Sequence, residues 1–165
     1  AEHGKEWTQN WAEGLVANMA RKPQGGDRDQ IRAVAAGECD IAVANTYYYG
    51  AMQNGDETDK SAAESVRLIW PNQDGRGAHV NVSGAGMVAA SEKTEAVTKL
   101  LEFLTTEESQ EWYAQVNNEF PVRPGVPASD TLAQWGEFKA DDLNLSTLGK
   151  LNPEAVRLMD RAGWQ

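Results

Sequence analysis

Residues 40–50 read Asp40-Ile41-Ala42-Val43-Ala44-Asn45-Thr46-Tyr47-Tyr48-Tyr49-Gly50. The apolar run at residues 41–44 predicts a short buried strand, and the polar and aromatic residues after it mark where that strand ends. In open α/β sheets, ligands bind beyond the carboxyl ends of the strands. We therefore expect the tyrosine cluster to face a cleft.

The tyrosines suit two different roles. Phenolate is a hard, anionic oxygen donor, so two phenolates side by side match a small, highly charged cation such as Fe³⁺, whereas soft metals need Cys or Met and zinc needs His or Cys. The other role is packing at a strand–helix junction, where each hydroxyl finds a hydrogen-bond partner. Composition alone favours packing, because tyrosine is an infrequent metal ligand.

Three further segments accompany residues 28–50. They are Lys22-Pro23-Gln24-Gly25-Gly26-Asp27-Arg28, Gly75-Arg76-Gly77-Ala78-His79-Val80-Asn81-Val82-Ser83-Gly84-Ala85-Gly86 and Phe120-Pro121-Val122-Arg123-Pro124-Gly125-Val126. With these segments in this order, essentially all 165 residues resemble the periplasmic ferric-iron-binding proteins that feed iron ABC transporters.

The resemblance implies an α/β fold, namely the C-terminal part of a two-lobed periplasmic binding protein of type II with a three-layer α/β/α lobe. Residues 1–75 would form a C-terminal lobe segment with the tyrosine motif. Residues 76–125 would cross the hinge and pack with the N-terminal lobe, and residues 126–165 would return as C-terminal helices. Because family members also have an N-terminal lobe, we expect that missing lobe, or another chain that supplies it, to be a partner.

The resemblance also implies the site. Tyr47 and Tyr48 match the adjacent tyrosines that bind the metal, which leaves Tyr49 with a structural role. Asn45 matches a position that in some members helps to hold a synergistic anion such as carbonate or phosphate, and Asp27 and Arg28 lie near a second such position. Other members bind iron without an anion, so Asn45 as an ordinary strand-end residue stays open.

Two functions follow from this resemblance. The first is an Fe³⁺-binding solute-binding protein of the periplasm that delivers iron to the membrane permease of an ABC transporter. The second is a binding protein of the same fold for an organic anion or other small solute. We expect no enzyme, because Cys39 is the only cysteine and neither His3 nor His79 is close to it in the sequence.

Composition excludes two classes of partner. The formal net charge is −10 with no basic patch to neutralise phosphates, so we expect no nucleic acid. No apolar run approaches the about 18 residues that a membrane span requires, so we expect no membrane-embedded segment.

Periodicity and capping residues predict the other elements. We expect helices at residues 2–20, 27–36, from the tyrosines to about 54, at 56–65, 92–104 and 106–117, and from residue 152 onward, with a second strand at 66–70. Asp27 is the expected N-cap of the second helix, and Pro153 is expected in the first turn of the last one. Leu100, Leu104 and Trp112 are expected to face the missing lobe.

Overall fold

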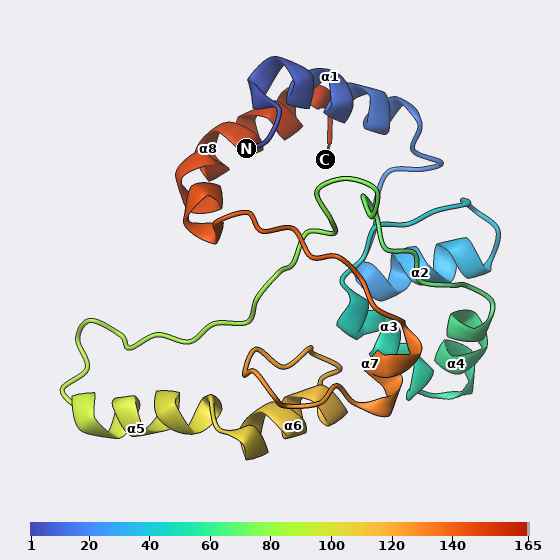
Figure 1. The fold of residues 1–165 in the computed structure, drawn as a ribbon. Helices are drawn as coiled ribbons and strands as arrows, with labels where there is room; N and C mark the ends of the chain where they lie inside the picture. Colours follow the sequence, from blue (N-terminus) through green and yellow to red (C-terminus); the bar gives the residue numbers. More distant parts are fainter. Residues whose placement is uncertain (165) are drawn as a thin grey trace.

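Residues 1–164 are described by a computed structural model and form eight helices (Figure 1). Their bounds are α1 Gly4–Ala17, α2 Asp27–Ala35, α3 Thr46–Gln53, α4 Glu57–Glu64, α5 Thr94–Leu104, α6 Glu107–Val116, α7 Asp130–Gln134 and α8 Leu145–Ala162. None of the helices in this part of the chain is long and apolar enough to cross a membrane.

The first and last helices, α1 and α8, pack against each other although they come from opposite ends of the chain (Figure 1). The predicted start of α8 near residue 152 is wrong, because Asn144 provides an earlier cap. Its side-chain oxygen accepts hydrogen bonds from the backbone N–H of Ser146 at 3.0 Å and from the Ser146 hydroxyl at 2.7 Å. Pro153 consequently lies inside the helix, where it cannot donate to the carbonyl four residues before it.

The helices α2, α3 and α4 enclose the main apolar cluster. Its buried members are Ile31, Met52 and Ala63, with Tyr48 and Tyr49 packed against them. Each of the three helices contributes one of these buried residues. The cluster therefore holds α3, which carries the tyrosines, against α2 and α4.

The N-cap of α2 lies one residue before the predicted position. Gly26, not Asp27, is its N-cap, and the Asp29 carboxylate accepts the Gly26 N–H at 2.8 Å. The acidic residue three positions after the cap satisfies an N–H group that no helix carbonyl can reach, as in a capping box. Asp27 therefore stands inside the first turn with its carboxylate free for another partner.

The predicted strands at residues 41–44 and 66–70 are not formed within residues 1–164, and the α/β/α layering is not confirmed there. The described residues form no β-ladder, and their one isolated bridge is the parallel contact between Ala78 and Ala140. Ile41 and Ile69, which were expected in buried strands, are 77% and 66% exposed. A strand exists only where a neighbouring segment offers paired N–H and C=O groups, and the described chain offers such a neighbour at a single point.

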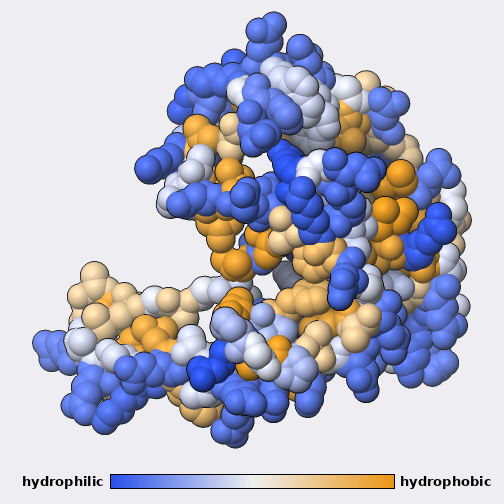
Figure 2. Space-filling model, in the orientation of Figure 1, coloured by the Kyte–Doolittle hydropathy of each residue, from blue (hydrophilic) through white to orange (hydrophobic). Residues whose placement is uncertain are grey.

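The helices α5 and α6 follow each other in an arm, the α5–α6 arm, in which α5 projects away from the rest of the chain while α6 packs against α7 (Figure 1). Thr106 caps α6 as predicted, since its hydroxyl accepts the Ser109 N–H at 3.3 Å. Leu100 and Trp112 on this arm are 55% and 54% exposed, whereas Leu104 is half-buried. Figure 2 shows apolar surface on this arm and around the hollow between it and the α1–α8 pair.

Candidate metal-binding site

The tyrosine pair lies in the first turn of α3. Asn45 is the N-cap, with extended backbone (φ −73°, ψ 136°), and Thr46 is the first helical residue. Successive residues of a regular helix point about 100° apart. The rings of Tyr47 and Tyr48 nevertheless lie side by side, with centroids 4.3 Å apart and planes tilted by 38°. The structure thus brings together two adjacent phenols, the arrangement that the sequence predicts for a metal-binding pair.

The surroundings of the pair keep the first phenol protonated. The pKa of Tyr47 is raised to about 12, first by its side-chain hydrogen bond with Tyr48, then by burial, and then by negative charge on Tyr48, Asp27 and Glu119. Negative neighbours that oppose ionisation of a phenol stabilise a cation at the same place. A trivalent metal ion would reverse the effect, because its own charge stabilises the phenolates.

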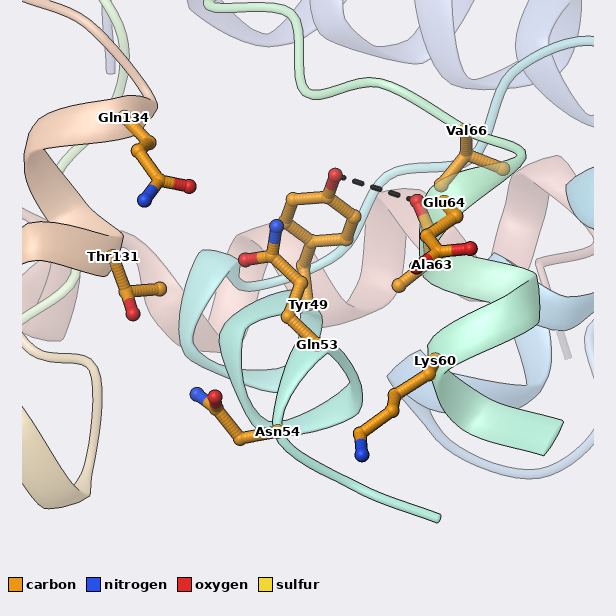
Figure 3. Close-up of a pocket in the computed structure, with 9 residues that line it drawn as sticks. All are labelled: Tyr49, Gln53, Asn54, Lys60, Ala63, Glu64, Val66, Thr131 and Gln134. Atoms are coloured by element: carbon orange, nitrogen blue, oxygen red, sulfur yellow. Dashed lines mark hydrogen bonds between the residues drawn. The ribbon is translucent and has the colours of Figure 1, made fainter. Parts of the chain in front are cut away.

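The third tyrosine has a separate, structural environment. The Tyr49 hydroxyl donates to the Ala63 carbonyl on α4 at 3.4 Å, and its ring lies 6.0 Å from that of Trp135. Burial raises the pKa of Tyr49. Figure 3 shows the Tyr49 side chain in a pocket of about 340 Å³ between α4 and α7, with its hydroxyl directed at Ala63. These contacts support the structural role expected for Tyr49.

Two of the three predicted anion-contact residues lie together. The Asp27 carboxylate accepts hydrogen bonds from the Asn45 backbone N–H at 2.7 Å and from the Asn45 side-chain amide at 3.3 Å. Arg28 is exposed and forms no ion pair within the described residues. The anion-contact role of these three residues stays a prediction.

Sequence reasoning missed Glu119. Its carboxylate accepts hydrogen bonds from the Ser83 hydroxyl at 2.8 Å and from the Asn117 side-chain amide at 3.4 Å. The preceding residue, Asn118, packs directly against Gly50 of α3, which brings Glu119 within electrostatic range of Tyr47. Only its position beside the Phe120 segment hinted at a role, and no periodic pattern predicts this approach to α3.

Within residues 1–164, no group of three or more His, Cys, Asp or Glu side chains is arranged to hold a metal ion. The tyrosine pair, with carboxylates nearby, is therefore the candidate that the described part of the chain offers. Two phenolates occupy only part of the coordination sphere of a hard cation, so the remaining donors would come from elsewhere.

Comparison with known proteins gives a family and several relatives. A family described as bacterial extracellular solute-binding protein matches residues 2–140. The chain is 46% identical to Iron uptake protein A2 of Synechocystis sp., over 100% of this chain and 49% of that protein. It is 27% identical to the Major ferric iron-binding protein of Neisseria meningitidis serogroup B, over 97% of this chain and 46% of that protein.

Solved structures agree with these matches. The Trichodesmium protein IdiA (FutA), in complex with iron and citrate, superposes with a TM-score of 0.94 and 45% identity, covering 99% of this chain and 52% of that one. The ferric binding protein of Campylobacter jejuni superposes with a TM-score of 0.96 and 39% identity, again over 99% and 52%. The chain thus spans about half the length of the curated relatives it matches. The expected architecture, part of a type II solute-binding fold, is confirmed, although its sheet is not formed by residues 1–164.

Proposed function

Because this chain belongs to the bacterial extracellular solute-binding protein family, we propose that it is part of an iron-uptake solute-binding protein in which Tyr47 and Tyr48 bind Fe³⁺. The observation that carries this proposal is the pair of phenol rings 4.3 Å apart at the start of α3. Relatives whose names describe iron uptake and ferric iron binding match nearly the whole chain. None of these names describes an enzyme, which supports a binding role without catalysis.

The chemistry of the pair suits Fe³⁺. Phenolate is a hard donor, and two negative charges offset much of the charge of a trivalent ion. A synergistic anion such as carbonate or phosphate would supply further oxygen donors. The iron and citrate bound in the Trichodesmium protein support an anion in that place.

Exposed apolar side chains indicate that another part of the protein, or a partner, covers this surface. Phe103 and Trp112 on the α5–α6 arm are 50% and 54% exposed, and Val43 beside the tyrosines is 87% exposed. Burial of such surface releases about 25 cal/mol per Å², so a protein gains stability by covering it. We propose that the other lobe of the two-lobed fold covers these residues, and that residues 1–75, 76–125 and 126–165 divide between the lobes as the resemblance implies.

The last part of the proposal concerns the delivery of the bound iron to a transporter. A solute-binding protein of this family would carry iron through the periplasm to the permease of an ABC transporter. The lobes would close over the metal by a hinge motion and exclude water from it.

The test is the visible spectrum of the chain during titration with Fe³⁺ supplied as its nitrilotriacetate complex. Ferric phenolate has a visible charge-transfer band, whereas an organic solute bound by the same fold has none. We expect the band in the wild type and in the matched controls Tyr49→Phe and Tyr113→Phe. The double variant Tyr47→Phe/Tyr48→Phe should lose the band and keep its fold, because phenylalanine retains the ring. An undiminished band in the double variant would refute the assignment.

A further inference from the structure

Asp27 contacts Asn45, which lies 18 residues further along the chain, and this contact joins the start of α2 to the start of α3. One carboxylate oxygen accepts both hydrogen bonds from Asn45, at 2.7 Å from the backbone nitrogen and 3.3 Å from the side-chain nitrogen. Hydrogen bonds to an ionised acceptor are shorter and stronger than those between neutral groups, and the backbone bond has such a length.

The carboxylate of Asp27 is not needed by its own helix. Asp29 accepts the N–H of Gly26 at the start of α2 and also pairs with Arg32 at 2.9 Å. Asp27 is half-buried at the first position of α2, so its side chain can reach across to the next segment. Its only side-chain hydrogen-bond partner within the described residues is Asn45.

The partner, Asn45, determines where α3 begins. Its backbone carbonyl accepts the N–H of Tyr48 at 3.2 Å, which is the first turn of the helix. Its side chain forms no cap to its own helix, because the amide is turned toward Asp27. A residue that fixes the backbone of Asn45 therefore fixes the direction in which Tyr47 and Tyr48 leave the chain.

We propose that Asp27 is a positioning residue for the metal site: its carboxylate holds Asn45 and thereby sets the start of α3, from which Tyr47 and Tyr48 reach the metal. The effect on Fe³⁺ binding that this proposal predicts rests on the proposed function. This role differs from direct contact with an anion, for which a carboxylate is poorly suited because like charges repel.

The experiment compares the wild-type chain with Asp27→Ala, which removes the acceptor, and Asp27→Asn, which keeps an oxygen acceptor without the charge. Asp27→Ser is a second loss variant, since its shorter side chain cannot reach Asn45 but still suits a helix start. Asp40→Ala is the matched control, because it removes an exposed carboxylate near the site in the sequence that contacts neither Asn45 nor the start of α2. Each protein is examined by near-ultraviolet circular dichroism without metal, and then by titration with Fe³⁺ nitrilotriacetate.

We expect Asp27→Ala and Asp27→Ser to change the tyrosine dichroism, shift the visible band and weaken Fe³⁺ binding about tenfold, the usual loss for a residue that orients a ligand. Asp27→Asn should restore the dichroism and most of the affinity, and Asp40→Ala should leave both unchanged. Equal losses in Asp27→Asn and Asp27→Ala would overturn the proposal, because the charge rather than the contact would then matter. So would wild-type behaviour of both loss variants, or an affinity that depends on added carbonate in the wild type but not in Asp27→Ala.

The two hypotheses fail in different ways. If no protein in the series binds Fe³⁺, the proposed function is wrong. The dichroism of the metal-free variants still decides whether Asp27 positions the tyrosine pair.

Discussion

Substitution of Gly50 by alanine tests the contact that joins α3 to the segment after α6. A Cβ atom at this position would lie 2.6 Å from Cγ, 2.7 Å from Cβ and 2.9 Å from Oδ1 of Asn118. All three distances are below 3.0 Å, so one of the two segments has to move. Asn118 is only 4% exposed and has a positive φ of 56°, which leaves it little room to yield.

Two effects oppose each other in Gly50→Ala. Alanine in the interior of a helix is favoured over glycine by about 1 kcal/mol. Overpacking of a buried contact costs about 1–3 kcal/mol, and here the nearest clashing atoms include the Cβ of Asn118, which cannot rotate away. We therefore expect Gly50→Ala to lower the free energy of unfolding, by up to about 2 kcal/mol. The displacement should also weaken Fe³⁺ binding, because Gly50 and the tyrosine pair share α3.

The assay is urea unfolding followed by circular dichroism. Gly14→Ala in α1 is the matched control, because nothing lies within 4 Å of a Cβ at that position. It should raise the free energy of unfolding by about 0.5–1 kcal/mol. The double variant Gly50→Ala/Asn118→Gly should recover stability relative to Gly50→Ala, since glycine removes the clashing atoms and accepts the positive φ. A Gly50→Ala protein as stable as Gly14→Ala would refute the reasoning.

Three further predictions concern other regions. Asp59→Ala should lower the free energy of unfolding by about 2 kcal/mol in urea titrations, because Asp59 is 7% exposed and accepts a hydrogen bond from the Arg32 guanidinium at 2.7 Å. The control Glu57→Ala removes an exposed ion pair and should change the stability little, so equal effects of the two substitutions would contradict this prediction. Absorbance titration without metal should show Tyr47 ionising near its raised pKa of about 12, and Tyr48→Phe should bring that pKa back toward 10.0; no change would show that the hydrogen bond is not the main cause. Leu100→Ser should reduce self-association of the chain in sedimentation without loss of stability, since Leu100 is 55% exposed. If the wild type self-associates and the variant does so equally, the contact between copies lies elsewhere.

The tyrosine titration also has a stability consequence with a definite sign. The pKa of Tyr47 in the folded chain lies above the unfolded value of 10.0. Its contribution to stability is therefore fully present below pH 10 and is lost as the pH rises toward about 12. Unfolding experiments on wild type and Tyr47→Phe across that interval should converge at its upper end.

Local signals in the sequence predicted most helices. Thr106 capped α6 as expected, because a hydroxyl before two glutamates satisfies the first N–H groups whatever the rest of the fold does. The short helix α7 was not predicted, since its five residues carry no periodic pattern and its start depends on the Ser129 cap. The helices that could be predicted from the sequence are thus those with both a capping residue and a periodic apolar pattern.

Non-local features were harder to predict. The run at residues 41–44 has strand composition, but composition does not supply the neighbouring strand, and Val43 is 87% exposed. The role of Asp27 was assigned by resemblance to an anion contact, and its bonds to Asn45 depend on how α2 and α3 pack. The adjacency of Tyr47 and Tyr48 could be read from the sequence, but the close approach of their rings depends on the side-chain conformations in the first turn of α3.

The pairing of α1 with α8 has a consequence for the order of folding. These helices are separated by on the order of a hundred residues, so their contact closes a long loop and carries a large entropic cost before it gives any return. Contacts of such high sequence separation form slowly, and during synthesis α1 cannot complete this contact before α8 has left the ribosome. Pulse-labelling hydrogen exchange should accordingly show protection of α2–α4 before protection of α1. Trp7 and Trp11, stacked 6.3 Å apart on α1, should therefore stay accessible to chaperones until α8 arrives, and they remain 50% and 46% exposed in the folded chain.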